Sequence, residues 1–202
     1  MAYVLGFFIA DGCMFSNKRG SRYVAFYSND RDILKKIRTV IGVTNRIGER
    51  AIRKGMKRPG YVLQIGSRTM FEDLSLLGIT PNKSSSILFP KVPRPYLAHF
   101  TRGYFDGDGN VSISVYKRKD RQGRLNRTML SGFTSGSKDF LVGLRERLIR
   151  FASVGSGTLY FANRAHRLYY SVNDSKKLYQ FMYPHSLQSL FLDRKKAVFE
   201  RF

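Results

Sequence analysis

Two stretches, YVLGFFIADG at residues 3–12 and HFTRGYFDGDG at residues 99–109, each contain an apolar run that ends in aspartate and glycine. They align at one internal glycine and at the closing Asp-Gly. The matched pairs are Gly6 with Gly103, Asp11 with Asp108, and Gly12 with Gly109. A match of this kind, far apart in one chain, indicates an internal duplication.

Further similarity follows in the same order along the chain. FYSNDRDIL (26–34) resembles FTSGSKDFL (133–141), and IGSRTMFEDL (65–74) aligns loosely with VNDSKKLYQF (172–181). A segment rich in proline and serine separates the copies. We therefore expect an N-terminal half at 1–80, a linker at 81–97 and a C-terminal half at 98–202.

Each half reads as helix, strand pair, helix, strand pair, helix, an αββαββα order. The strand runs partly alternate apolar and polar residues, whereas the helical runs repeat apolar residues at i, i+3 and i+4. Ser28 or Asn29, and Ser135 or Ser137, are suited to cap the middle helices. The expected fold class is α+β, with two pseudo-symmetric halves, each an antiparallel sheet covered by helices on one face.

Small residues lie four apart in both motif runs, at Gly6 and Ala10 and at Gly103 and Gly107. Such spacing lets two helix backbones approach closely, so we expect these helices to pack against each other along the seam between the halves. Asp11 and Asp108 would then meet at the helix C-termini.

A carboxylate at a helix C-terminus opposes the helix dipole, at a cost of about 0.3–1 kcal/mol. Two neighbouring carboxylates also repel each other. A hard divalent cation would relieve both penalties, and Mg²⁺ accepts one or two carboxylates together with water and phosphate oxygens. Gly12 and Gly109 are expected to end the helices in the left-handed conformation. A single Asp-Gly would more simply be a turn, but the repetition favours a metal site.

The charge balance indicates the partner. The 202 residues include 36 Lys+Arg against 14 Asp+Glu, a net charge of +22, with 43% hydrophobic residues. The apolar content predicts a folded core, and the excess charge favours a polyanion, above all nucleic acid. The apolar run 3–10 is too short to span a bilayer and lacks the flanks of a signal peptide, so we expect no membrane association and an intracellular location.

Other metal chemistry is disfavoured. The single cysteine, Cys13, excludes an intramolecular disulfide and a cysteine-based zinc cluster. The three histidines, His99, His166 and His185, lack ligand spacing and are expected to be surface or packing residues.

LGFFIADG (5–12) and TRGYFDGDG (101–109) resemble the two signature motifs of the LAGLIDADG homing endonucleases, in the monomeric form that carries both copies. The resemblance implies two sheets that form a saddle on double-stranded DNA, with metal ligands at Asp11 and Asp108, supported by Ala10 and Gly107. It also implies hydrolysis of both strands, leaving short 3′ overhangs. The implied cofactor is Mg²⁺, with Mn²⁺ as a substitute and Ca²⁺ supporting binding without cleavage.

The chain departs from the family pattern in places. Ile9 stands where many members carry an additional acid, whereas Asp106 retains it and is interpreted as a structural or capping residue. The family tends to place a lysine near each metal, and Lys83 and Lys195 are the candidates, with ordinary solvated lysines as the alternative. Ser28 and Ser135 are candidates for positioning water.

The expected DNA-contacting residues lie in the hairpins, where arginine reads guanine and many lysines contact phosphates. A solvated charged surface is the alternative for any one of them. They are Arg22, Ser28, Arg50, Arg53, Lys54, Lys57, Arg58, Lys117, Arg118, Lys119, Arg121, Arg124, Arg127, Ser135, Arg164 and Arg167. Because the halves differ, the expected target is non-palindromic.

Four other functions fit parts of the pattern. An intron maturase, which would also bind its own intron RNA, or a non-cleaving DNA-binding regulator would use the same scaffold, but acids at both motif ends favour cleavage. An intein endonuclease domain is disfavoured because splicing signatures are absent, which favours a free-standing or intron-encoded enzyme. A ribosomal or structural basic protein leaves the paired motifs unexplained.

Overall fold

The computed structural model of the chain describes residues 1–52, 59–81, 85–117, 125–184 and 190–202. Within these ranges, no helix combines the length and the apolar character needed to cross a membrane.

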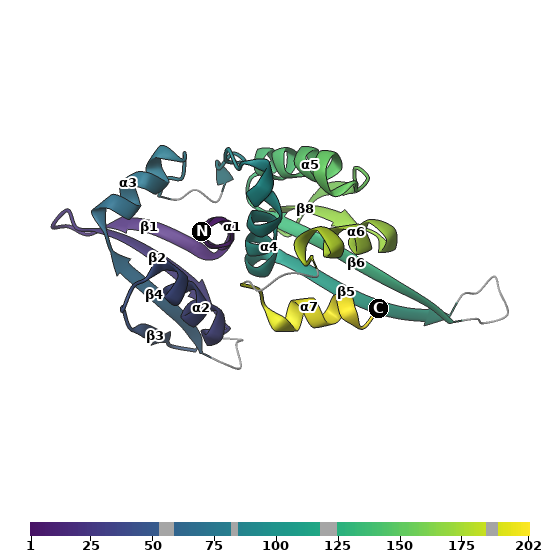
Figure 1. Cartoon of the computed structure of the whole chain (residues 1–202), viewed down its shortest axis with the longest axis horizontal. Coiled ribbons are helices and arrows are strands. Elements are labelled where there is room, and N and C mark those ends of the chain that lie inside the picture. The colour runs from purple at the N-terminus through teal and green to yellow at the C-terminus, as the bar shows by residue number, and fades with distance from the viewer. Residues whose placement is uncertain (53–58, 82–84, 118–124, 185–189) are drawn as a thin grey trace.

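The two halves repeat one order of elements (Figure 1). The first half contains α1 (Ala2–Asp11), β1 (Gly12–Ser16), β2 (Arg22–Ser28), α2 (Arg31–Ile41), β3 (Ile47–Arg50), β4 (Gly60–Gly66) and α3 (Arg68–Leu76). The second contains α4 (Leu97–Asp108), β5 (Gly109–Lys117), β6 (Leu125–Ser135), α5 (Lys138–Ala152), β7 (Thr158–Ala162), β8 (Ala165–Tyr170) and α6 (Val172–Met182). The short 3-10 turn η2 (Arg94–Tyr96) leads into α4. The predicted αββαββα repeat is confirmed.

One further helix, α7 (Asp193–Glu200), follows α6 and has no counterpart among the described residues of the first half. The sequence analysis did not predict it. Its N-terminal side lies beside the C-terminal end of α4, so it becomes part of the site described below.

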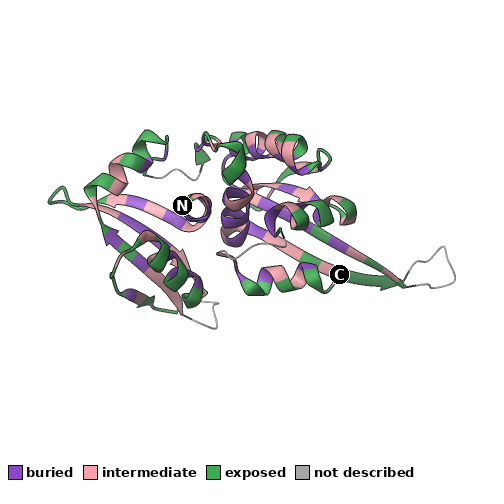
Figure 2. Cartoon of the chain, in the orientation of Figure 1, coloured by how far each residue is buried: buried purple, intermediate pink, exposed green. Residues whose placement is uncertain are grey.

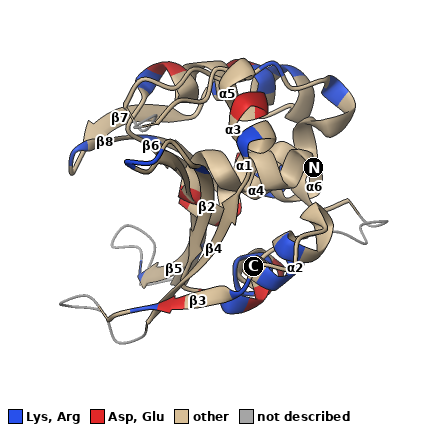
Figure 3. Ribbon diagram, turned by 90° about the vertical axis from the view of Figure 1, so that its left-hand side faces the viewer, with Lys and Arg blue, Asp and Glu red and all other residues tan. Residues whose placement is uncertain are grey.

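Each half contains one antiparallel four-stranded sheet, in the order β1-β2-β4-β3 and β5-β6-β8-β7. Alternation along the strands separates two faces. Val24 and Phe26 on β2, and Phe133 on β6, point toward the helices and are buried. Figure 3 shows the strands of both sheets curving around one side of the molecule, with the helices on the other side. The predicted fold class is confirmed.

The centre of the molecule is the contact between α1 and α4, which are largely buried (Figure 2). A Cβ added at Gly6 would lie 2.1 Å from the carbonyl oxygen of Phe100, and one added at Gly103 would lie 2.0 Å from that of Tyr3. A side chain at either position would collide with backbone, so both glycines are required for this close approach. The predicted seam of small residues is confirmed.

The expected left-handed conformation of Gly12 and Gly109 is wrong. Gly12 has φ −109° and ψ 161°, and Gly109 has φ −88° and ψ 161°, so both are extended. Glycine is required there for space, because an added Cβ would lie 2.1 Å from the Phe8 ring or 2.3 Å from the Phe105 ring. Each helix therefore passes directly into a strand.

The predicted caps are partly confirmed. Ser137 is the N-cap of α5, and its hydroxyl accepts a hydrogen bond from the Phe140 amide at 3.2 Å. In the first half the N-cap of α2 is Asp30, and the Ser28 hydroxyl accepts from the Asp30 amide instead.

We predict that Gly103→Ala lowers the free energy of unfolding by at least about 2 kcal/mol, because the new methyl group would overlap the α1 backbone. Urea denaturation measures the change. Gly48→Ala is the matched control, since its Cβ would meet Val62 at no less than 3.4 Å, and we expect a change within about 1 kcal/mol. Equal stability of the two variants would contradict the close helix contact.

Candidate nuclease site

The two motif carboxylates lie at the adjoining C-terminal ends of α1 and α4. A Cβ added at Gly107 would lie 2.3 Å from the Ala10 Cβ and 3.4 Å from Oδ2 of Asp11, so the Asp11 carboxylate borders the last turn of α4. Asp11 and Asp108 are half-buried, which leaves both accessible from solvent. The predicted approach of the two helix ends is thus present in the structure.

The negative charges of Asp11 and Asp108 shift the pKa of a neighbouring buried tyrosine, Tyr104. Burial raises the pKa of Tyr104 well above its usual value, and the negative charges of Asp108 and Asp11 raise it further. The Tyr104 hydroxyl donates to the Thr134 carbonyl at 2.7 Å, so this buried residue ties α4 to β6 beside the carboxylates.

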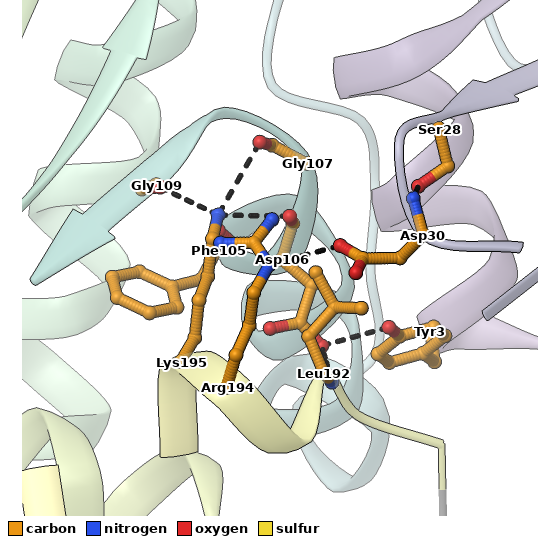
Figure 4. Close-up of polar contacts among 10 residues, drawn as sticks. All are labelled: Tyr3, Ser28, Asp30, Phe105, Asp106, Gly107, Gly109, Leu192, Arg194 and Lys195. Carbon is orange, nitrogen blue, oxygen red and sulfur yellow. Dashed lines mark hydrogen bonds and ion pairs between the residues drawn. The ribbon is translucent and has the colours of Figure 1, made fainter. Parts of the chain in front are cut away.

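Lys195 of α7 reaches the same end of α4 (Figure 4). Its ammonium nitrogen lies 2.6 Å from the Phe105 carbonyl oxygen, 2.8 Å from that of Asp106, 3.3 Å from that of Gly107 and 2.6 Å from that of Gly109. Phe105, Asp106 and Gly107 belong to the last turn of α4, where a helix leaves carbonyls without intrahelical partners, although the Phe105 carbonyl also accepts from the Gly109 amide. Gly109 is the first residue of β5. Lys195 therefore caps α4 and places a positive charge where the helix dipole is negative.

Burial lowers the pKa of Lys195 to about 8, and the charges of Asp106, Asp11 and Asp108 oppose that shift. Near neutral pH the side chain is mostly an ammonium group that can donate to the carbonyls. Its counterpart expected in the first half, Lys83, lies outside the described residues.

Asp106 is buried and joins three parts of the chain. Its Oδ2 accepts a hydrogen bond from the Tyr3 hydroxyl at 2.7 Å and another from the Leu192 amide at 2.8 Å. The first contact crosses the seam to α1, and the second holds the residue that precedes α7. Burial raises the pKa of Asp106 to about 6, although both hydrogen bonds act in the opposite direction. The contacts agree with the interpretation of Asp106 as a structural residue.

Other contacts fix the segment around α7. Arg102 is fully buried in α4, and its Nε donates to the Leu190 carbonyl at 2.8 Å. Arg194 of α7 pairs with Asp30 of the first half at 2.9 Å, also visible in Figure 4. The C-terminal helix thus contacts both halves beside the two carboxylates.

Sequence reasoning missed Tyr3, Leu192 and Arg102 as members of this network. In the sequence, Tyr3 and Arg102 stand out only as parts of the motif runs. The available signal was that the second motif has an acid, Asp106, where the first motif has Ile9. A single buried carboxylate needs hydrogen-bond donors from other parts of the chain.

Among the described residues, no three or more His, Cys, Asp or Glu side chains gather as a metal cluster. The donor set at the seam is two carboxylates, with the terminal carbonyls of Ala10 and Gly107 nearby. That set fits Mg²⁺, which keeps several waters and uses few protein ligands. The Gly107 carbonyl also lies 3.3 Å from the Lys195 ammonium.

The uncovered faces of the sheets carry aromatic and polar side chains. On the first sheet, Phe15 stacks on Tyr23 with ring centroids 5.2 Å apart, and the Arg50 guanidinium lies 4.6 Å from the Tyr27 ring centroid. On the second sheet Tyr160 stacks on Tyr169 at 6.0 Å.

Arg167 of β8 is paired with Tyr160 of β7 on one side and with Thr134 of β6 on the other. Its Nε is buried and has no hydrogen-bond partner among the described residues. A buried donor without a partner is costly until a ligand supplies an acceptor, which suits a contact with nucleic acid.

Other expected contact residues are placed differently. Arg22 forms an ion pair with Glu72 of α3 at 2.6 Å, and Arg127 donates to the Arg201 carbonyl beside α7. Both therefore point to the helix-covered face, away from the uncovered faces of the sheets. Ser28 and Ser135 accept from the amides of Asp30 and Ser137, which occupies them in local turns.

Arg164 sits in the turn between β7 and β8, where Asn163 and Arg164 have φ of 52° and 61°. It is exposed, as is Lys117 at the end of β5, and a DNA contact by either stays a prediction. The remaining basic candidates lie outside the described residues; they are Arg53, Lys54, Lys57, Arg58, Arg118, Lys119, Arg121 and Arg124.

Two family models match the chain. The LAGLIDADG-like domain matches residues 1–75, and the LAGLIDADG endonuclease model matches residues 102–202.

Similar solved structures include the LAGLIDADG meganuclease I-AabMI bound to uncleaved DNA, with TM-score 0.65, 14% identity and coverage of 98% of this chain and 87% of that one. The I-SmaMI homing endonuclease bound to cleaved DNA gives TM-score 0.62 at 15% identity, covering 98% and 86%. At these identities the likeness shows the fold.

Two curated proteins are 28% identical to this chain over 158 residues. Both are described as probable translation initiation factor IF-2, one from Thermococcus kodakarensis and one from Methanocaldococcus jannaschii. The aligned regions cover 73% and 74% of this chain but only 12% and 11% of those proteins. The chain therefore spans a small part of the length of these relatives.

We predict that Lys195→Met lowers the free energy of unfolding by about 1–3 kcal/mol, because it removes the ammonium donor from buried carbonyls at the end of α4 and the start of β5. Thermal and urea denaturation measure the effect. Lys196→Met is the matched control, since Lys196 pairs with Glu200 near the surface, and its loss should cost within about 0.5 kcal/mol. The same small loss in both variants would show that Lys195 does not cap α4.

The raised pKa of Asp106 predicts that the stability of the fold depends on pH. Its pKa is about 6 in the folded protein and about 3.9 in an unfolded chain. The folded state therefore binds more protons between these values, and its stability falls as pH rises from about 4 to about 6.

The measurement is the difference in unfolding free energy between wild type and Asp106→Asn across this range. We expect the wild type to lose of order 2 kcal/mol relative to the variant as pH rises. A difference that stays constant with pH would refute the raised pKa.

Proposed function

Because the chain belongs to the LAGLIDADG endonuclease family, we propose that it is a site-specific homing endonuclease that cuts both strands of DNA. We further propose a long non-palindromic target and products with short 3′ overhangs. The observation that carries the proposal is the approach of Asp11 to the last turn of α4, which also bears Asp108. One chain contains both motif helices, which supports action as a monomer.

We propose Mg²⁺ as the cofactor, held by Asp11 and Asp108 with the carbonyls of Ala10 and Gly107 nearby. When bound, a divalent ion activates water and neutralises the leaving oxygen in phosphodiester hydrolysis. Mn²⁺ should substitute, and Ca²⁺ should support binding without cleavage.

The chain's own residues supply position and charge. Lys195 fixes the last turn of α4, and so the direction of the Asp108 backbone, through its contacts with Phe105 and Gly109. Its ammonium group also places positive charge near the scissile phosphate. The uncovered sheet faces orient the duplex, and their unlike arginines, Arg50 and Arg167, support an asymmetric target.

A second candidate concerns the context of the enzyme. The match to a small part of two much longer translation factors supports an endonuclease domain carried within a host protein, as an alternative to a free-standing or intron-encoded enzyme. Maturase activity on intron RNA, or DNA binding without cleavage, are alternatives that the first experiment below separates.

We predict that Asp11→Asn and Asp108→Asn each reduce cleavage by at least about 100-fold, because each removes charge from the metal site. The assay is cleavage of a randomised duplex library in Mg²⁺ and in Ca²⁺, with sequencing of the ends. Duplex binding should persist in both variants.

The exposed Asp139 provides the control, and Asp139→Asn should cut as the wild type does. Wild-type binding without cuts in any divalent metal would favour a maturase or regulator. Undiminished cleavage by either motif variant would overturn the assigned role of that carboxylate.

We predict that Arg167→Lys relaxes the base preference at one position of the target by about 1–3 kcal/mol, because lysine keeps the charge but loses the bidentate contact to guanine. Selection of cut sites from the same library reads out this change. A uniform loss of affinity at every position would instead assign Arg167 to a phosphate.

A further inference from the structure

A second basic and aromatic surface lies outside the saddle, at the outer edge of the second sheet. Strand β7 is the edge strand there, and its residues face those of α5 across one hollow. Between them is a hollow of about 520 Å³, which we call the β7 hollow; its lining residues are Lys138, Val142, Arg145, Leu159, Tyr160, Phe161 and His166. Ligand pockets commonly have volumes of about 300–1,000 Å³.

The charged side chains that line the β7 hollow are basic. Lys138 and Arg145 supply positive charge from α5, and no acidic side chain is among the lining residues. The acids next to them in sequence, Asp139 and Glu146, are exposed on α5 but do not line the hollow. Neither Lys138 nor Arg145 forms an ion pair within the described ranges of the chain.

The β7 hollow also contains a largely exposed aromatic ring. Phe161 is 64% exposed, and its ring centroid lies 4.8 Å from that of His166, its partner across the strand pair. Val142 and Leu159 are half-buried and complete the apolar part of the lining. An exposed phenylalanine beside unpaired cations has no role in packing the core.

Phosphate-binding cations next to an exposed aromatic ring are the arrangement that binds a nucleotide strand through both its backbone and its bases. A duplex hides the faces of its bases, so only an unstacked base can use the Phe161 ring. We propose that the β7 hollow binds single-stranded nucleic acid, with a base against Phe161 and flanking phosphates on Lys138 and Arg145. The β7 hollow borders the uncovered sheet face only at Tyr160, because Phe161 and His166 lie on the opposite face of the same strand pair. Binding there requires no cleavage, so the proposal stands independently of the proposed function.

The test uses the full chain with fluorescent oligothymidylate and oligouridylate, measured by polarisation. Excess unlabelled duplex is included to occupy the saddle. We expect both or one of the strands to remain bound, and the comparison of the two identifies DNA or RNA as the preferred source. Complete displacement of both strands by duplex would overturn the proposal.

Variants assign the binding to the hollow. Phe161→Ala should weaken single-strand binding by about tenfold or more, and Phe161→Tyr should retain it. Lys138→Gln and Arg145→Gln should each reduce the slope of log affinity against log salt by about 0.7. Ile149→Ala and Arg150→Gln, on the same helix but outside the hollow, are the matched controls and should change neither quantity.

Two results would contradict this assignment. If Phe161→Ala binds single strands as tightly as the wild type does, the ring does not stack on a base. If Lys138→Gln and Arg145→Gln weaken duplex binding but leave single-strand binding unchanged, the hollow contacts the flank of the duplex in the saddle.

Discussion

The backbone contact between α1 and α4 at Gly6 and Gly103 is the constraint on which the rest of the structure depends. Each glycine lets its helix reach the opposite backbone so closely that a single methyl group would not fit. This approach joins two sheets that otherwise belong to separate halves. It also sets the distance between the two helix ends, and therefore between Asp11 and Asp108. The stability of the core and the geometry of the site thus have one common origin.

The site is asymmetric although the fold is repeated. The second motif carries Asp106 and is held by α7, whereas the first carries Ile9 and has no matching helix in the part of the chain that the structure describes. Asp106 joins Tyr3 of the first half to Leu192 of the C-terminal segment, and Lys195 holds the carbonyls at the end of α4. A buried carboxylate and a buried ammonium group are costly to desolvate. Here Oδ2 of Asp106 accepts two hydrogen bonds and the Lys195 ammonium donates to backbone carbonyls, while Oδ1 of Asp106 has no partner among the described residues. These contacts hold the end of α4 against both α1 and the C-terminal segment.

The sequence was sufficient to predict the duplication, the αββαββα order and the close approach at the small residues. These features rest on local patterns that repeat, so each copy supports the other. The conformation of Gly12 and Gly109 was mispredicted, because the glycines serve to avoid the rings of Phe8 and Phe105, a contact that no local pattern reveals.

The direction in which individual side chains point was also predicted poorly. Arg22 looked like a DNA contact from its charge and position, but strand alternation turns it toward Glu72 on the covered face. The helix α7 was missed because the residues it contacts, Phe105 and Asp106, lie far away in sequence. Local sequence patterns do not reveal which residues far apart in the chain will be in contact.

The central claim is that the helix seam makes Asp11 and Asp108 parts of one shared cation site. The most direct measurement is Mn²⁺ affinity of the duplex-bound protein, by electron paramagnetic resonance, for wild type, Asp11→Asn, Asp108→Asn and the double variant. A shared ion predicts strong non-additivity, with each single substitution costing nearly as much affinity as both together. Independent, additive losses, or Mn²⁺ binding unchanged in the double variant, would contradict the account.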